Sequence, residues 1–279
     1  MSQVKHIGAL KGRVLLFGGV YSNLEALQAM HTLAEKQNIP SQNIICTGDI
    51  VGYCADPEEC LQYTKEWGIH TIAGNVELNL VDNSENCGCD FTEGSRCDDF
   101  SKQWYPYAQS KVTPKSLDYI ASIPEFITFD YAGKKCFVLH GSIDNTSEFI
   151  FGSTNESAKS TIIQQAEADM IIAGHSGLPF AQNIGDKLWL NPGVIGMPAN
   201  DGTARVWFTI LESNPEFRYS ISSLKYDHLL ANQKILQNPL PATYAETLLT
   251  GLWDNMEILP KEERTQKGIP ILEIKGRII

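Results

Sequence analysis

Short apolar segments alternate with amphipathic segments along the first part of the chain, and the apolar segments stop at glycine. Residues 13–17 (RVLLF), 43–47 (NIICT) and 70–73 (HTIA) have the length and composition of buried β-strands. Helices are predicted between them, over residues 23–35 and 57–67. Because strands that alternate with helices pair in parallel through crossovers, this rhythm predicts an α/β sheet.

The rhythm changes beyond residue 80. A polar stretch over residues 80–112, rich in cysteine, glycine, aspartate and aromatic residues, interrupts the alternation. We expect a helix near 114–122, a helical segment over 226–253 before an irregular tail, and strands over 126–131, 136–140, 170–173, 187–190, 204–211 and 217–224. The simplest organisation is one domain over residues 1–224, with 80–112 as an insertion, followed by a C-terminal helical extension over 225–279.

The net charge and the cysteine content indicate which partners and which cellular compartment to expect. The 279 residues include 33 acidic and 22 basic side chains, which gives a net charge of −11. Such a surface repels phosphate backbones, so we expect no long nucleic acid as a partner. No apolar run approaches the roughly 18 residues of a membrane span, and the first residues lack a signal-peptide core. Seven cysteines in such a chain are expected as reduced thiols, which predicts a cytoplasmic protein without a membrane partner.

Four polar residues stand beside glycine where predicted strands end. They are Asp49, Asn75, His140 and His175. Ligands of open α/β sheets bind beyond the carboxyl ends of the strands, and glycine lets the backbone turn and approach closely there. One carboxylate, one amide oxygen and two imidazoles suit Mn, Fe, Zn, Co or Ni better than Ca. The sequence therefore predicts a site for a divalent metal ion.

Each of these residues also has a simpler interpretation. An aspartate after a strand is often a helix cap, an asparagine after glycine is often a turn residue, and a single histidine is often a buried polar group. Four such residues, each with its own glycine at a strand end, favour the metal site over these alternatives.

The same residues belong to a series of motifs that resembles the calcineurin-like metallophosphoesterase superfamily, in particular its small bacterial phosphodiesterase branch. The family blocks read D-x-H-(S/G)-N, G-D-x-x-G, G-N-(H/C/V)-(D/E), H-G, G-H-(T/S)-H and N-P-G-(S)-x-G-x-P. This chain has, in the same order over roughly residues 13–212, the segments 19–23 (GVYSN), 48–52 (GDIVG), 74–77 (GNVE), 140–141 (HG), 174–177 (GHSG) and 191–198 (NPGVIGMP). The resemblance implies an α/β fold in which a β-sandwich of two mixed sheets is flanked by helices.

The resemblance also implies two metal shells, of which this chain retains one. In the family, one ion is held by the Asp and His of the first block and the last His of G-H-x-H. The corresponding residues here are Gly19, Tyr21 and Gly177. Glycine offers no ligand atom and neutral tyrosine is a poor ligand, so that site is expected to be lost. The ligands of the other ion correspond to residues that are all present, namely Asp49, Asn75, His140 and His175. We therefore expect about one divalent ion per chain.

The catalytic residues expected from this resemblance are Asp49, Asn75 and Glu77. Val76 stands where many members carry a histidine for the leaving group, and Glu77 is a candidate substitute acid, with a solvent-facing carboxylate as the alternative. Asn23 and Asn191 are candidate substrate-binding residues. A single ion can still activate water and polarise a phosphoryl oxygen, at a lower rate than two ions.

Two classes of function follow. The first is a metal-dependent phosphoesterase that hydrolyses a phosphodiester or phosphomonoester, with a phosphorylated small molecule or a nucleotide as substrate. The second is a catalytically inactive family member that binds a phosphorylated ligand or a protein. The intact ligand set favours the enzyme, and the lost ligands favour the binding module. The C-terminal region over residues 213–279 could form a lid or the face of a homo-oligomer.

The cysteines of the insertion admit three interpretations. Cys87, Cys89 and Cys97 could hold a structural zinc ion, could replace the lost metal ligands, or could be partly buried reduced thiols. A C-x-C pair with a third cysteine eight residues later is not a strong zinc spacing, so reduced thiols are expected.

Overall fold

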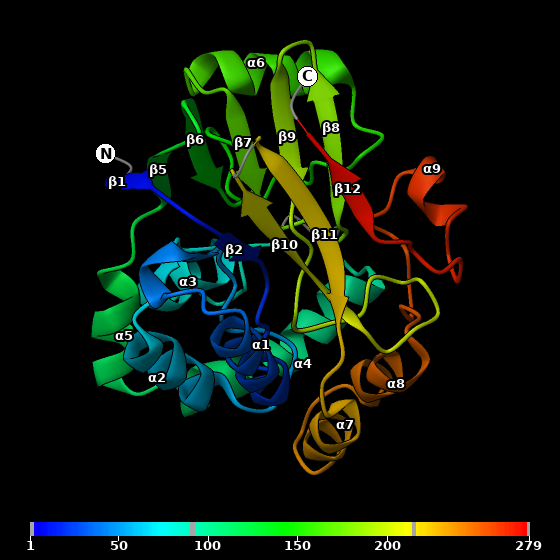
Figure 1. Cartoon of the computed structure of the whole chain (residues 1–279). Helices are drawn as coiled ribbons and strands as arrows, with labels where there is room; N and C mark the ends of the chain where they lie inside the picture. Colours follow the sequence, from blue (N-terminus) through cyan, green and yellow to red (C-terminus); the bar gives the residue numbers. More distant parts are fainter. Residues whose placement is uncertain (1–2, 90–92, 214–215, 278–279) are drawn as a thin grey trace.

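Two mixed β-sheets pack face to face in the computed structural model, which describes residues 3–89, 93–213 and 216–277 (Figure 1). The first sheet has the order β1 (Val4–Leu10), β5 (Phe126–Tyr131), β6 (Lys134–Leu139), β7 (Met170–Ala173), β9 (Lys187–Asn191) and β8 (Phe180–Ile184). The second has the order β12 (Ile274–Gly276), β11 (Arg218–Leu224), β10 (Val206–Glu212), β2 (Val14–Phe17), β3 (Ile44–Cys46) and β4 (His70–Thr71). Each sheet contains parallel and antiparallel pairs, so the predicted sandwich of two mixed sheets is confirmed.

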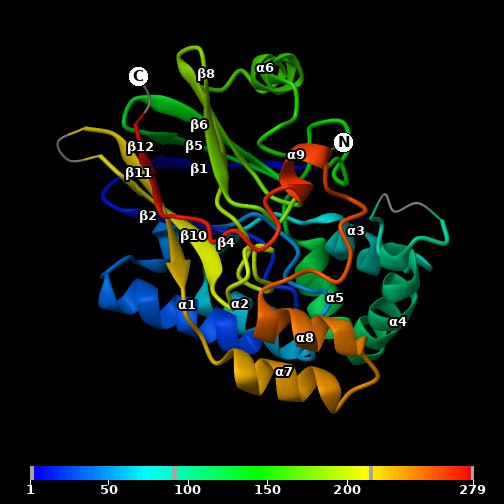
Figure 2. The same ribbon diagram turned by 90° about the vertical axis from the view of Figure 1, so that its right-hand side faces the viewer.

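Helices cover both outer faces of this sandwich (Figures 1 and 2). The outer face of the second sheet packs against α1 (Leu24–Lys36), α2 (Pro57–Trp67), α3 (Asn75–Val81), α4 (Arg96–Lys111) and α5 (Pro114–Ala121). The first sheet is covered by α6 (Glu156–Gln165). The C-terminal part contains α7 (His228–Leu236), α8 (Ala242–Thr250) and α9 (Lys261–Arg264). None of the described helices is long and apolar enough to cross a membrane.

Alternation along the strands divides the core into layers. In β2, Leu15 and Phe17 face the helices, whereas Val14 and Leu16 face the other sheet. Successive side chains of a strand point to opposite faces, so an entirely apolar strand must be covered on both sides. This requirement explains why the short run RVLLF occupies the middle of the four-layer structure.

Three strands were not predicted, namely β1, β8 and β12. All three lie at sheet edges. Edge strands are covered on fewer sides, and the side chains of β1 and β12 are exposed or half-buried, so these segments carry a weak apolar signal. The tail that was expected to be irregular therefore returns to the second sheet through β12, and the C-terminal extension is not wholly helical.

The helical segment predicted over residues 226–253 is two helices. Pro239 and Pro241 lie between α7 and α8, where proline removes a backbone donor and ends the first helix. Residues 90–92 of the predicted insertion lie outside the described residues. The remainder of the insertion contains the end of α3 and the whole of α4.

Replacing Leu16 by alanine tests the inter-sheet layer. Leu16 is fully buried between the sheets, so we expect Leu16→Ala to lower the free energy of unfolding by about 2–5 kcal/mol. Leu272, which precedes β12, is 80% exposed, and Leu272→Ala should change the free energy of unfolding by less than about 0.5 kcal/mol. Chemical denaturation of both variants provides the comparison, and equal effects would contradict this assignment of the core.

Candidate metal centre

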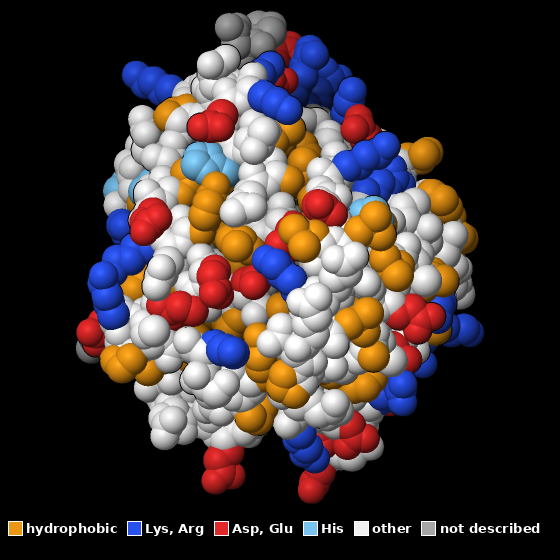
Figure 3. Space-filling view, turned by 90° about the horizontal axis from the view of Figure 1, so that it is seen from below, with side chains coloured by type: hydrophobic (Ala, Val, Ile, Leu, Met, Phe, Trp, Pro, Cys, Tyr) orange, Lys and Arg blue, Asp and Glu red, His pale blue; other side chains and the backbone are white. Residues whose placement is uncertain are grey.

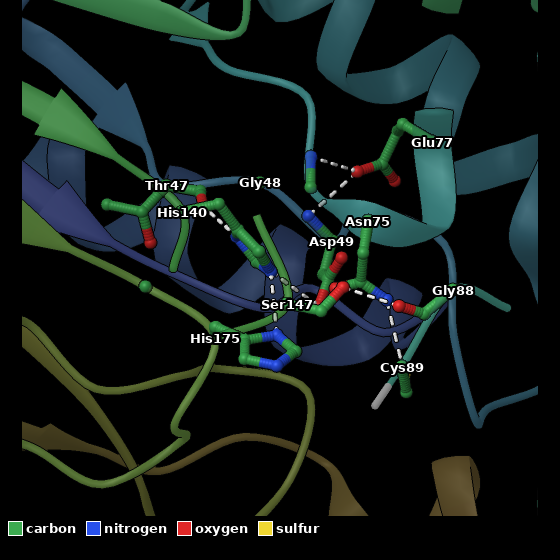
Figure 4. Close-up of polar contacts among 12 residues, drawn as sticks. Thr47, Gly48, Asp49, Asn75, Glu77, Gly88, Cys89, His140, Ser147 and His175 are labelled. Atoms are coloured by element: carbon green, nitrogen blue, oxygen red, sulfur yellow. Dashed lines mark hydrogen bonds and ion pairs between the residues drawn. The ribbon is translucent and has the colours of Figure 1, made fainter. Parts of the chain in front are cut away.

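The four predicted metal ligands come together where strand ends of both sheets meet (Figure 4). Asp49 follows β3, and Asn75 is the first residue of α3, which follows β4 in the second sheet. His140 follows β6, and His175 follows β7 in the first sheet. The site therefore depends on the packing of the two sheets against each other.

Asp49, His140 and His175 form a compact buried cluster. Nε2 of His140 lies 3.1 Å from Oδ2 of Asp49 and 3.1 Å from Nδ1 of His175. The three side chains offer ligand atoms that all lie within 4.8 Å of one another. Ligand atoms that are each about 2.0–2.2 Å from a shared ion lie about 3 Å apart, so these separations suit a first-row divalent metal.

Unpaired polar atoms provide a second test of this fit. Oδ1 of Asp49 and Oδ1 of Asn75 are buried and have no hydrogen-bond partner among the described residues. Buried acceptors without partners are costly, and a cation satisfies several of them at once. The donor set of carboxylate, amide and imidazole also suits such an ion, so the residues fit the predicted metal.

Hydrogen bonding and burial set the orientation and the pKa values of the two histidines. The carbonyl oxygen of Thr47 accepts a hydrogen bond of 2.6 Å from Nδ1 of His140, which directs Nε2 of this ring toward the cluster. Burial lowers the pKa of His140, but the Asp49 carboxylate and the Thr47 carbonyl outweigh burial, so the net shift is upward and a metal ion must compete with a proton for Nε2. Burial and the neighbouring His140 lower the pKa of His175 to about 3, so this ring is neutral at pH 7.

Asn75 is oriented by the cysteine segment. Its Nδ2 donates to the carbonyl oxygen of Cys87 at 2.9 Å and to Sγ of Cys89 at 3.2 Å. Because both bonds use the amide nitrogen, Oδ1 of Asn75 remains free to bind a metal ion (Figure 4). The described residues contain no metal-type cluster built from Cys87, Cys89 and Cys97, and all three are free thiols. The sequence did not reveal this positioning role of Cys87 and Cys89.

Glu77 supports the backbone of the site and does not face solvent, which corrects the alternative drawn from sequence. Its carboxylate accepts hydrogen bonds from the backbone N–H groups of Asp49, Gly74 and Val51 at 2.9, 2.9 and 3.0 Å. The side chain is fully buried and does not line the pocket beside the metal cluster. Burial and the charge of Asp49 raise the pKa of Glu77 to about 7. This placement suits a residue that positions the backbone of Asp49, and the catalytic role of Glu77 stays a prediction.

Asn23 and Asn191 form hydrogen bonds within the chain. Asn23 accepts from the N–H of Ala26 as the cap of α1 and donates to the carbonyl oxygen of Gly196. Asn191 donates to the carbonyl oxygen of Gly174 and accepts from the N–H of Gly193. Both side chains are fully buried and neither lines the pocket, so their role in substrate binding stays a prediction.

Backbone conformations around the site are unusual. Asp49 and His175 have φ angles of 54° and 57°, in the left-handed region that non-glycine residues rarely adopt. A Cβ atom at Gly74 would lie 2.1 Å from Oδ1 of Asp49, so only glycine leaves room for this carboxylate. Strained backbone of this kind is typical of functional sites, where side chains must be held in a fixed geometry.

The positions of the lost metal shell face aromatic rings. A Cβ atom at Gly177 would lie 3.6 Å from the indole ring of Trp253, which belongs to the C-terminal extension. Tyr21 is buried, and burial together with the charge of Asp49 raises the pKa of its hydroxyl well above its usual value. The phenol therefore stays protonated, as expected for a residue that does not bind metal.

A pocket of about 110 Å³ opens directly above the cluster. Two of the predicted metal ligands, the cysteine segment and the C-terminal extension line it, and the lining residues include Tyr21, Asp49, Tyr53, Cys89, Phe149, His175, Tyr244 and Trp253. The ring of Phe149 stacks on His175 at 4.2 Å between centroids. The site is thus a metal-type cluster at the floor of a largely aromatic pocket.

Comparison with known proteins places this fold and site in a family. The model of the calcineurin-like phosphoesterase superfamily domain matches residues 18–214. An uncharacterized protein of Methanocaldococcus jannaschii is 26% identical over 263 residues, with 87% of this chain and 99% of the relative covered. The chain belongs to the calcineurin-like phosphoesterase superfamily.

Solved structures agree with this assignment at the level of the fold. A metallophosphoesterase from Sphaerobacter thermophilus has a TM-score of 0.68 at 19% identity, with 87% of this chain and all of that chain covered. A hypothetical protein from Pyrococcus horikoshii has a TM-score of 0.72 at 17% identity, with 86% and 99% covered. The family recognised from the motifs is therefore confirmed.

Removing the Glu77 carboxylate tests its role in holding the site. Glu77→Ala leaves three buried N–H groups without their acceptor, and we expect the free energy of unfolding of the metal-free protein to fall by about 2–4 kcal/mol. Glu66→Ala, at an exposed position of α2, serves as the control. Chemical denaturation measures both variants, and equal stability would contradict the positioning role.

Metal content tests the ligand set. We expect about one divalent ion per purified chain after loading with manganese or zinc, and close to none in Asp49→Ala or His175→Ala, because each variant removes a ligand of the cluster. His6→Ala, on exposed β1, should bind metal as the native protein does. Elemental analysis provides the measurement. Full metal content in either ligand variant would show that the ion binds elsewhere.

Proposed function

We propose that this protein is a phosphoesterase that hydrolyses a phosphodiester or phosphomonoester with one divalent metal ion per chain. The observation that carries this proposal is the convergence of Asp49, His140 and His175 beside a pocket that Asp49 and His175 line, with unpaired oxygens on Asp49 and Asn75. A buried carboxylate beside two imidazoles, with Asp49 and His175 in the left-handed backbone region, is typical of a functional site.

The chain would hold the ion through Asp49, Asn75, His140 and His175. Bound there, a divalent ion supplies Lewis acidity to a phosphate ester and makes water a better nucleophile at neutral pH. The residues around it set the geometry. The Thr47 carbonyl fixes the tautomer of His140, Phe149 stacks on His175, and Glu77 holds the backbone of Asp49.

The pocket supports a small phosphorylated substrate. Tyr53, Phe149, Tyr244 and Trp253 form aromatic walls next to the ligand cluster, which suit a nucleobase or another flat apolar group. Asp49 and Asp254 also line the pocket, and together with the net charge of −11 they disfavour a long polyanion. We therefore propose a nucleotide or a similar phosphorylated small molecule and no long nucleic acid.

The surface and the cysteines support two further expectations. The cysteines are free thiols, which supports work in the reducing cytoplasm. Apolar side chains lie among charged ones on the face seen from below (Figure 3). Leu229 and Leu236 of α7 and Leu249 of α8 are 57%, 58% and 45% exposed. We propose these helices as the contact of a homo-oligomer, without a membrane partner.

Hydrolysis of bis(p-nitrophenyl) phosphate tests the enzymatic function. We expect turnover with added manganese, its loss on chelation, and its return when the metal is restored. Asp49→Asn keeps the size of the side chain but removes the charge that binds the ion, so turnover should fall at least roughly 100-fold. His6→Ala should retain native activity.

Two results would contradict this function. Turnover that survives both chelation and Asp49→Asn would come from another site or a contaminant. Metal binding without turnover of any phosphate ester, cyclic nucleotides and nucleotide diesters included, would favour the inactive binding module.

A further inference from the structure

The ring of Tyr21 occupies a cradle made by three glycines beside the metal cluster. A Cβ atom at Gly19 would lie 2.5 Å from Cζ of Tyr21. A Cβ at Gly196 would lie 2.5 Å from Cβ of Tyr21, and one at Gly52 would lie 3.0 Å from its Cδ1. A side chain at Gly19 would collide with the Tyr21 ring, one at Gly196 would collide with its Cβ, and one at Gly52 would press on the ring, so the three glycines leave room for Tyr21.

The backbone of Tyr21 is equally constrained. Its φ angle is 51°, a conformation that bulky residues rarely adopt. The N–H of Tyr21 donates to the carbonyl oxygen of Asp49 at 3.0 Å, and the carbonyl oxygen of Tyr21 accepts from the N–H of Cys54 at 3.0 Å. The ring of Tyr53 meets the phenol edge-on at 4.7 Å. The phenol is therefore held in one place relative to the Asp49 segment.

The location of the hydroxyl group follows from this packing. Cζ carries the hydroxyl, and it lies where the side chain of a residue at position 19 would begin. Tyr21 lines the same pocket as Asp49 and His175. A carboxylate at 19 and a tyrosine ring at 21 cannot occupy this space together. The Tyr21 ring thus occupies the space beside Gly19, and the residue lines the pocket.

We propose that Tyr21 is a substrate-contacting residue whose hydroxyl donates a hydrogen bond to a phosphoryl oxygen of the ligand bound at the Asp49–His140–His175 cluster. A neutral phenol placed in a preformed pocket is a fixed donor, and a fixed donor stabilises negative charge without reorganising. Tyr21 thereby supplies part of the stabilisation that a second cation would give. Its effect on turnover rests on the proposed function, whereas its effect on phosphate binding does not.

Tyr21→Phe tests this assignment because it removes the hydroxyl and keeps the ring in its cradle. The metal-loaded native protein, Tyr21→Phe and Tyr105→Phe are compared by calorimetric titration with inorganic phosphate. Tyr105 is a buried tyrosine of α4 whose hydroxyl has no partner among the described residues, and it lies outside the pocket. Tyr21→Phe should bind phosphate roughly ten- to hundred-fold more weakly. Tyr105→Phe should bind it as the native protein does.

Turnover and metal content separate this inference from the proposed function. We expect kcat/KM of Tyr21→Phe to fall about 100-fold while the metal content stays at that of the native protein. Native phosphate affinity in Tyr21→Phe would overturn the inference and leave the phosphoesterase standing. Loss of metal from Tyr21→Phe would also overturn it, because the tyrosine would then act on the ligand cluster. Weaker phosphate binding in a protein without any turnover would support the inference and refute the proposed function.

Discussion

A buried carboxylate requires a positive partner, and the centre of this structure is organised around that requirement. Asp49 is buried at the junction of the two sheets, with the carboxylate of Glu77 held against its backbone N–H. His140 lies against Asp49, and its pKa rises because the carboxylate favours the charged ring over the effect of burial. A divalent ion would compensate the negative charge of Asp49 more strongly than a protonated histidine does. It would also bind the oxygens of Asp49 and Asn75 that are otherwise unpaired.

The cluster depends on both sheets of the sandwich, because each sheet supplies two of its four residues. Asp49 and Asn75 belong to the second sheet, whereas His140 and His175 belong to the first. The bond from His140 to the Thr47 carbonyl joins the two sheets at the site itself. The packing of the apolar strands therefore fixes the positions of the predicted ligands. A shift of one sheet against the other would separate the imidazoles from the carboxylate.

Aromatic side chains lie at the positions where the family resemblance places the ligands of a further metal ion. The Tyr21 ring lies over Gly19, and Trp253 from the C-terminal extension lies near Gly177. The extension also supplies Tyr244 to the aromatic wall of the pocket. The C-terminal extension therefore contributes to the lining of the pocket beside the predicted metal ligands.

The buried strands, most helices, the family and the residues that could bind metal were predictable from the sequence, because periodicity and motifs are local properties of the chain. The edge strands β1, β8 and β12 escaped prediction because their side chains carry little apolar signal. The hydrogen-bond partners of Glu77, Asn23 and Asn191 became visible only in the folded chain. Whether a polar side chain meets a ligand or a backbone group depends on neighbours distant in sequence, such as Gly196 for Asn23. The same reason applies to Tyr21, whose position over Gly19 is set by tertiary packing.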